Sequence, residues 1–365
     1  MRIPVFDLHI GDQLTEDIYN SFGLHLLSAK TMINSNDIAY LLKHNIDMVS
    51  IEPRIGFSPI EEVAVAIDDP VIPEIIIDNT FTDHSSYFTT IAFEEAISGI
   101  KDLFEQTSLH NHLDASSADA SFIPLITNVK MEKDVVSLLL SLNSNDDYTF
   151  QHSVQVGLIC YFLATWLGKS EKEAKHISKA GYLHDIGKSK ISEDILTKPG
   201  KLTDEEFTEM KNHTVYGYEL ILASMGDEEL ALSALEHHER MDGSGYPHGK
   251  QSIEIHPISN IVAVADIYSA MISNRVFQKK KDLLYVLKEL HRMSFGQLDP
   301  NVVQVFIKNM VPNFIGKKIT MESGETGKII MINQTDFFRP LIQINDQFID
   351  LTQNRNLDIQ MIHMA

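Results

Sequence analysis

The sequence predicts a mainly α-helical protein, with a small α+β module before the helices and a small β-rich appendage after them. Residues 154–167 and 258–272 are long apolar stretches, which have the length of buried helices rather than of strands. After about residue 312, short apolar runs alternate with turn residues, as is typical of strands. The predicted parts are an α+β module at 1–55, an acidic connector at 56–125, a helical domain at 126–311 and a β-rich appendage at 312–365.

The first 125 residues contain two regions that differ in composition and hydrophobic pattern. Residues 1–55 carry short apolar runs at 3–6, 24–27 and 48–51 and one helical stretch near 37–43. The following region is acidic and is interrupted by Pro59, Pro70 and Pro73. It then shows a helical pattern at 90–106 and a polar, serine-rich stretch through Ser117. We interpret it as a connector that contains one helix, not as a second catalytic unit.

Several local signals place helices and strands in the rest of the chain. Gly168 follows the apolar stretch 154–167 and predicts the end of a helix there. Thr203 and Glu206 have the spacing of a capping box, which predicts the start of a helix that carries His213. Strands are expected at 318–321, 328–332 and 341–344, with a turn around Gly324.

The charge of the 365-residue chain restricts its partners. It has 51 acidic residues against 30 lysines and arginines, a formal net charge of −21. Such a surface repels long polyanions, so no nucleic-acid polymer is expected as a partner. It also repels a small phosphorylated substrate, which would need metal ions or cationic side chains next to its phosphates.

The single cysteine and the absence of long apolar runs bear on the cellular compartment of the protein. Cys160 excludes an internal disulfide, and its apolar neighbours predict a buried side chain. The N-terminus lacks the apolar core of a signal peptide, and no run of about 18 apolar residues predicts a membrane span. We therefore expect a cytoplasmic protein without membrane contact.

Histidines and carboxylates occur together in the predicted helical domain. His184 is followed directly by Asp185, and His237 by His238, before a glycine-rich loop at 242–249. Asp266 lies among aliphatic residues, where a buried carboxylate needs a cation or strong hydrogen bonds. Imidazole and carboxylate without thiolate form the ligand set of catalytic Fe, Mn or Zn sites. Two such ions can generate hydroxide and hold phosphate oxygens during an in-line displacement.

Each of these features has an ordinary explanation when it is taken alone. A His-Asp pair, two adjacent histidines or a single helical histidine such as His152 is usually structural or exposed. Asp266 alone could be a buried, hydrogen-bonded carboxylate. Their occurrence together in one helical domain favours a metal site.

The motifs resemble those of a known family. Residues 183–188 (Leu-His-Asp-Ile-Gly-Lys), 195–203, 210–213 and 237–247 (His-His-Glu-Arg-Met-Asp-Gly-Ser-Gly-Tyr-Pro) closely resemble the HD-GYP subgroup of HD-domain phosphohydrolases. The resemblance covers about residues 140–310 and implies an HD-domain helical bundle that carries the metal site. Residues 8–12 resemble the start of a small domain often found ahead of HD-GYP domains.

The resemblance also implies roles for individual residues. Asp185 would bridge two metal ions and take part in catalysis. Lys188 would be catalytic and face the scissile phosphate, and Arg275 and Tyr246 would bind substrate. The Gly-Tyr-Pro loop at 245–247 is associated with partner contacts. The polar side chains of Arg240 and His248 are expected to solvate this loop and not to act in the chemistry. The implied metal ligands are His152, His184, Asp185, His213, His237, His238 and Asp266.

Two departures from the family pattern bear on activity. Tyr148 stands where members with three metals have a glutamate, which favours two ions here. Residues 276–278 are Val-Phe-Gln where the family commonly has Pro-Tyr-Arg. The missing cation would cost about 1.5–3 kcal/mol of phosphate binding. Because every implied ligand is retained, we do not interpret the domain as degenerate.

The resemblance implies hydrolysis of cyclic di-GMP to linear pGpG, and further to GMP, by a metal-bound hydroxide. It favours two Fe or Mn ions over Zn. Two alternatives stay open: a cyclic-dinucleotide receptor with little turnover, and a phosphodiesterase for a mixed cyclic dinucleotide. A protein with a cyclic-dinucleotide synthase domain and a second copy of the chain are further partners to consider.

Overall fold

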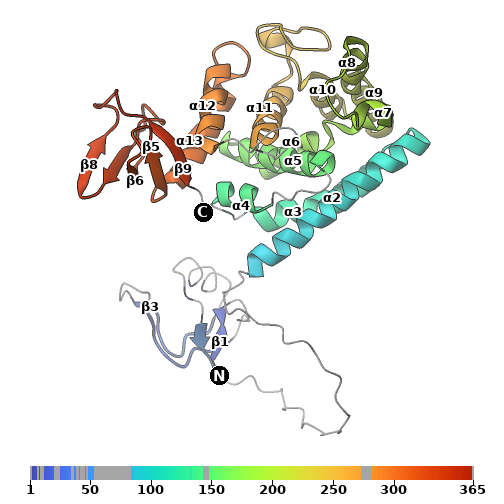
Figure 1. Ribbon diagram of the computed structural model, residues 1–365. Coiled ribbons are helices and arrows are strands. Elements are labelled where there is room, and N and C mark those ends of the chain that lie inside the picture. Colours follow the sequence, from blue (N-terminus) through green and yellow to red (C-terminus); the bar gives the residue numbers. More distant parts are fainter. Residues whose placement is uncertain are drawn as a thin grey trace, which may run out of the picture. The chain divides into compact units, whose positions relative to one another are not determined.

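The computed structural model describes residues 2–5, 8, 12–19, 25–33, 37, 41, 46, 48–52, 84–130, 132, 134–142, 148–272 and 282–363 (Figure 1). The chain divides into two compact units, Met1–Asp78 and Asn79–Ala365. Among the described residues, no helix is long and apolar enough to cross a membrane.

The first unit contains short antiparallel strand pairs around a small core. Strand β1 (Arg2–Pro4) pairs with β4 (Met48–Ser50), and β2 (Ile18–Tyr19) pairs with β3 (His25–Leu27). The helix predicted near 37–43 lies largely outside the described residues. The core of this unit is built by aliphatic side chains, namely Ile3, Val5, Leu8, Leu14, Ile18, Ile33, Leu41, Val49 and Ile51.

The second unit is mainly helical, as the sequence predicts. Its α-helices are α2 (His84–His110), α3 (Ala115–Val129), α4 (Val135–Ser141), α5 (Tyr148–Trp166), α6 (Glu171–Leu183), α7 (Glu193–Leu196), α8 (Asp204–Lys211), α9 (His213–Met225), α10 (Glu228–Glu236), α11 (Pro257–Ile272), α12 (Leu283–Met293) and α13 (Pro300–Met310). Short 3-10 helices are η2 (Ile186–Lys190), η3 (Ser252–Glu254) and η4 (Val311–Phe314).

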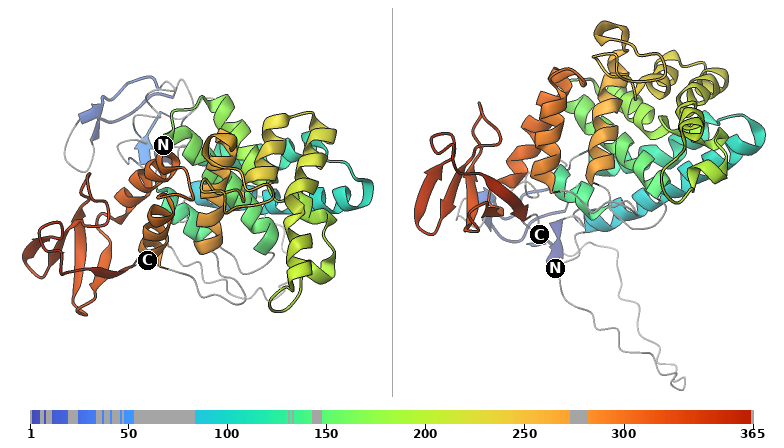
Figure 2. Two further views of the ribbon diagram at one scale, coloured as in Figure 1. Left: turned by 90° about the horizontal axis from the view of Figure 1, so that it is seen from above. Right: turned by 45° about the horizontal axis from the view of Figure 1, so that its top comes forward.

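Helices α5 and α6 form the centre of this unit (Figure 2). Their backbones approach closely because Gly181 has no side chain: a Cβ atom there would lie 2.7 Å from the Cys160 Sγ and 2.9 Å from the Val156 carbonyl oxygen. Cys160 is fully buried, as predicted. Helix α5 ends at Trp166, and Gly168 follows with φ +78°, which confirms the predicted stop.

Helices α2 and α3 belong to the same core. The predicted helix at 90–106 is confirmed as part of α2, whose Ala96 carbonyl accepts a 2.8 Å hydrogen bond from the Tyr182 hydroxyl of α6. Helix α3 begins within the serine-rich stretch, where the Asp114 side chain accepts the Ser116 N–H at 3.0 Å. The boundaries drawn around the connector stay predictions.

One prediction about helix length was wrong. The capping box at Thr203 and Glu206 is confirmed, but the helix that it opens ends at Lys211. His213 begins the next helix, α9, instead. A capping box marks where a helix begins and carries no information about where it ends. At the break, the His213 imidazole is held by its Nδ1, 2.7 Å from the Met210 carbonyl oxygen.

The C-terminal appendage is a five-stranded antiparallel sheet at one end of the helices, next to α12 and α13 (Figure 1). Strands β5 (Lys318–Met321), β6 (Thr326–Met331) and β7 (Leu341–Ile344) confirm the predicted strands. Strands β8 (Gln347–Asp350) and β9 (Ile359–His363) complete the order β8-β7-β6-β5-β9. Ile319, Ile329 and Ile342 are buried and join the core of the helices.

Candidate metal centre

The seven predicted metal ligands lie on, or directly after, five helices that pack on one another. His152 lies on α5 and Asp266 on α11. His184 and Asp185 follow the end of α6, and His213 is the first residue of α9. The paired histidines His237 and His238 follow the end of α10. Every one of these side chains except that of His238 is buried.

Asp185 is the centre of the first part of the site. Its side chain is 1% exposed. Its Oδ2 atom lies 3.3 Å from the His184 Nε2, and its Oδ1 atom lies 3.3 Å from the His213 Nε2 and 3.9 Å from the His237 Nε2. Among the described residues, Oδ1 has no hydrogen-bond partner. A buried carboxylate oxygen that faces imidazole nitrogens without a proton donor is the expected environment of a cation.

Asp266 organises the second part. Its Oδ1 atom lies 3.0 Å from the His152 Nε2, and its Oδ2 atom lies 3.8 Å from the His238 Nδ1. Within the described residues, three sets of potential ligand atoms lie within 4.8 Å of one another, and together they include all seven predicted ligands. These sets are His213, His237 and His238; His152, His184 and Asp266; and His184, Asp185 and His237.

The second nitrogen of most of these imidazoles is held by the protein. His184 Nδ1 lies 2.7 Å from the Gly181 carbonyl oxygen, and His237 Nδ1 lies 2.9 Å from that of Ala234. His152 Nδ1 lies 3.0 Å from the Ser269 hydroxyl. In the neutral rings of His184 and His237, Nδ1 donates to these carbonyl oxygens, which fixes the tautomer and leaves the Nε2 lone pair available to a metal.

The electrostatics of the histidines also favour metal binding. Burial lowers the pKa of His213 to about 4 and that of His238 to about 3. Burial likewise holds the pKa of His237 well below its ordinary value and lowers the pKa of His152. These imidazoles are therefore neutral near pH 7, which is the form that coordinates a metal.

The two carboxylates are ionised under the same conditions. Burial would raise the pKa of Asp185, but the Lys188 ammonium and the neighbouring imidazoles hold it well below the usual range. Burial would also raise the pKa of Asp266, but the hydrogen bond from His152 lowers it strongly. His184 differs, because the Asp185 carboxylate outweighs burial and raises its pKa. Ionised carboxylates and neutral imidazoles fit a divalent cation.

The structure places two of the three predicted substrate contacts next to the predicted ligands. Lys188, on η2, donates from Nζ to the Asp185 Oδ2. The Tyr246 ring lies 4.6 Å from the His238 ring, and burial raises the pKa of its hydroxyl. Arg275 and the Val-Phe-Gln sequence at 276–278 lie outside the described residues, as does the side chain of Tyr148.

Sequence reasoning missed two carboxylates that adjoin the histidine pair. Glu236 and Glu239 are 1% and 2% exposed. Both accept hydrogen bonds from residues that follow them in the chain. Acidic residues on both sides of adjacent histidines were the available signal, but their burial depends on tertiary packing.

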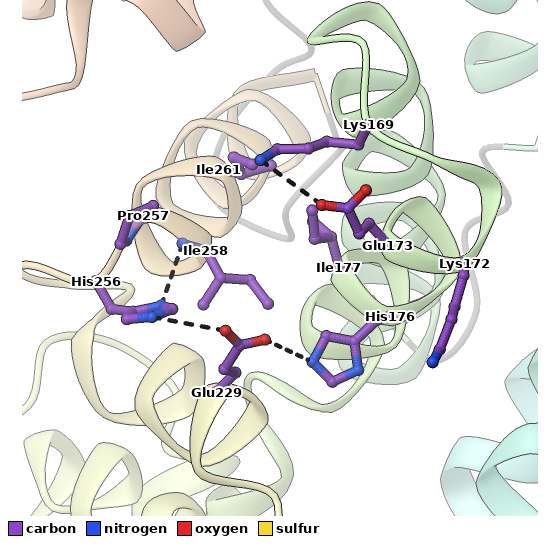
Figure 3. Close-up of a pocket in the computed structure, with 10 residues that line it drawn as sticks. All are labelled: Lys169, Lys172, Glu173, His176, Ile177, Glu229, His256, Pro257, Ile258 and Ile261. Carbon is purple, nitrogen blue, oxygen red and sulfur yellow. Dashed lines mark hydrogen bonds and ion pairs between the residues drawn. The ribbon is translucent and has the colours of Figure 1, made fainter.

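A cavity of about 540 Å³ lies elsewhere, among α6, α10 and the start of α11 (Figure 3). Ile177 and Ile258 contribute apolar lining, and His176 and His256 face the Glu229 carboxylate from opposite sides, with Nε2 to oxygen distances of 3.2 and 3.9 Å. None of the predicted ligands lines this cavity. It is therefore separate from the candidate metal centre.

The family profile that matches the chain is described as HD domain, and it covers residues 137–302. This range contains all seven predicted ligands. The chain carries an HD domain. A solved HDG"Y"P protein from Bdellovibrio bacteriovorus shares the fold: the TM-score is 0.50 at 15% identity, over 84% of this chain and 97% of that one.

Several curated relatives of this HD-domain chain are phosphodiesterases by name. A cyclic di-GMP phosphodiesterase of Pseudomonas aeruginosa is 29% identical over 94% of this chain and 84% of its own length. A cyclic di-GMP phosphodiesterase of Thermotoga maritima is 43% identical over 48% of each chain. A 3′3′-cGAMP-specific phosphodiesterase of Vibrio cholerae is 32% identical over 55% of this chain and 48% of its own. The chain thus spans about half the length of the latter two.

Proposed function

We propose that this HD-domain protein is a metal-dependent phosphodiesterase that hydrolyses a cyclic dinucleotide, with cyclic di-GMP as the substrate. The observation that carries the proposal is the buried Oδ1 of Asp185, which faces two imidazole nitrogens and has no hydrogen-bond partner among the described residues. Burial of such a carboxylate oxygen costs free energy when no cation is bound. A bound divalent cation would offset this cost and could take part in catalysis. The names of the relatives support a cyclic-dinucleotide substrate.

Two divalent ions would be held by the seven residues. The ligand set contains five imidazoles and two carboxylates and no thiolate, which suits Fe or Mn. When bound, such ions supply Lewis acidity toward phosphate oxygens and lower the pKa of water. The chain's own residues orient four of the five imidazoles through Nδ1 hydrogen bonds and keep the carboxylates ionised.

Lys188 would provide charge stabilisation next to the scissile phosphate. Its side chain is 23% exposed, and its Nζ donates to the buried Asp185 carboxylate. A fixed ammonium next to developing negative charge stabilises the transition state. The surrounding net charge of −21 makes such a local cation more important for an anionic substrate.

The proposal is tested by measuring the metal content of protein purified without oxygen, together with turnover of cyclic di-GMP by the same sample. We expect about two Fe or Mn ions per chain and formation of linear pGpG or GMP. Metal and substrate binding without product would favour a receptor. Protein that binds no divalent metal would contradict the proposal.

A mixed cyclic dinucleotide is the second candidate substrate, because one relative is named as specific for 3′3′-cGAMP. Turnover of the two compounds should be compared by competition at equal concentration, since the ratio of kcat/KM values defines specificity. A higher value for 3′3′-cGAMP would replace cyclic di-GMP in the proposal. A synthase-domain partner at the Gly-Tyr-Pro loop and a homodimer stay predictions.

Replacement of Lys188 by methionine is expected to lower kcat by roughly 100-fold, because one stabilising charge is lost while the metal ligands remain. The measurement is steady-state turnover combined with metal analysis of the same preparation. The control is Lys201→Met, at an exposed lysine outside the site. An unchanged kcat in Lys188→Met, with metal content equal to that of the wild type, would remove Lys188 from the mechanism.

A further inference from the structure

Two buried carboxylates bracket the histidine pair in the sequence Glu236-His237-His238-Glu239. Their exposed fractions are 1% and 2%, which is rare for glutamate and requires strong hydrogen bonds. Neither belongs to a set of potential metal-ligand atoms found among the described residues. Their role must therefore be sought in the groups that they contact.

Glu239 holds the glycine-rich loop. Its Oε1 accepts the His248 N–H at 2.7 Å, and its Oε2 accepts the Lys250 N–H at 3.0 Å. The loop passes so close to this residue that a Cβ atom at Gly245 would lie 2.4 Å from the Glu239 Cα. The same passage brings the Tyr246 ring against His238.

Glu236 holds the end of the loop and the start of α11. Its Oε1 accepts from the Lys250 Nζ at 2.6 Å. Its Oε2 accepts the His256 N–H at 2.8 Å and the Ser259 hydroxyl at 2.9 Å. His256 and Ser259 lie at the beginning of the helix that carries Asp266.

We propose that Glu236 and Glu239 are positioning residues. They connect the histidine pair to the glycine-rich loop and to the start of helix α11. Glu239 sets the loop that places Tyr246 on His238. Glu236 sets the start of α11 and hence the position of Asp266. The effect on turnover rests on the phosphodiesterase function proposed above, whereas the structural coupling does not.

The chemistry of these contacts explains why a carboxylate is needed. In these contacts both oxygens of each glutamate act only as hydrogen-bond acceptors. A glutamine of the same shape can accept at only one end, and its NH₂ group would face another donor. Glu239→Gln and Glu236→Gln therefore remove one anchor each without removing volume.

The experiment is hydrogen exchange of the full-length, metal-loaded protein, with metal analysis and steady-state kinetics on the same samples. In Glu239→Gln we expect the amide that faces the new NH₂ group, either that of His248 or that of Lys250, to exchange roughly 10–100-fold faster. In Glu236→Gln the faster amide should be that of His256. The control is Glu254→Gln, an exposed carboxylate that accepts the Gln251 N–H in the same stretch.

We expect kcat/KM of Glu239→Gln to fall roughly 10–100-fold, with a rise in KM and with metal content retained. Exchange rates in Glu239→Gln equal to those of Glu254→Gln would overturn the proposal. If Glu239→Gln does not fold, Lys250→Met tests the Glu236 anchor, because this change removes only a partly exposed partner of Glu236. Unchanged exchange of the His256 amide in Lys250→Met would then count against the proposal. A wild-type protein without turnover would contradict the proposed function. The exchange rates would still decide whether Glu236 and Glu239 hold the loop and the start of α11.

Discussion

Replacement of Asp185 by asparagine is expected to lower kcat/KM for cyclic-dinucleotide hydrolysis by about 1,000-fold or more, because several kcal/mol of charge stabilisation by the metal centre depend on it. Asparagine has the same shape but no negative charge. Its NH₂ group would face either the Lys188 ammonium or the His213 imidazole, since these lie on opposite oxygens of Asp185. Both the charge and the ligand geometry would be lost.

The measurement combines turnover with the metal content of each preparation. Asp194→Asn is the matched control, because Asp194 is an exposed carboxylate on the short helix α7, nine residues further along the chain. We expect wild-type activity and metal content from this control. Asp185→Asn protein with normal metal content and turnover would show that Asp185 is not part of the centre.

Replacement of Gly187 by alanine is expected to destabilise the protein by about 1–3 kcal/mol and to weaken metal binding. Its Cβ atom would lie 2.0 Å from the His213 carbonyl oxygen and 2.4 Å from the Gly217 nitrogen. Both neighbours are backbone atoms of α9, so the overlap can be relieved only if η2 and α9 move apart. That movement separates Asp185 from His213, the first residue of α9.

Chemical denaturation with and without a chelator measures both effects of Gly187→Ala. The control lies in the same 3-10 helix: Ser189→Ala removes a buried hydroxyl that has no hydrogen-bond partner among the described residues. Its loss should be close to neutral. If Gly187→Ala retained wild-type stability and metal affinity, the close contact between η2 and α9 would not be required for the site.

Local signals in the sequence predicted the helices that pack by their apolar faces. Helix α11 and the stop of α5 near Gly168 were predicted because hydrophobicity and glycine act over a few residues. The break between α8 and α9 was not predicted. It depends on how His213 packs against η2, where Gly187 meets His213 and Gly217, which lie 26 and 30 positions further along the chain.

Residue types favoured a metal site in the helical domain, and the resemblance to the HD-GYP subgroup implied which seven residues are its ligands. Their arrangement in space depended on the fold. Glu236 and Glu239 were not found, because glutamate side chains are ordinarily exposed. Only the return of the loop and of α11 toward α10 surrounds these carboxylates with donors.

The sequence by itself determined that this protein has a mainly helical domain with a potential metal-binding set, because hydrophobic periodicity and ligand chemistry are properties of residues. The tertiary structure decided which atoms face one another: Asp185 between three imidazoles, Asp266 between His152 and His238, and two glutamates beneath the loop. Those contacts join residues up to 114 positions apart. No local pattern encodes such a distance, since it results from the packing of whole helices.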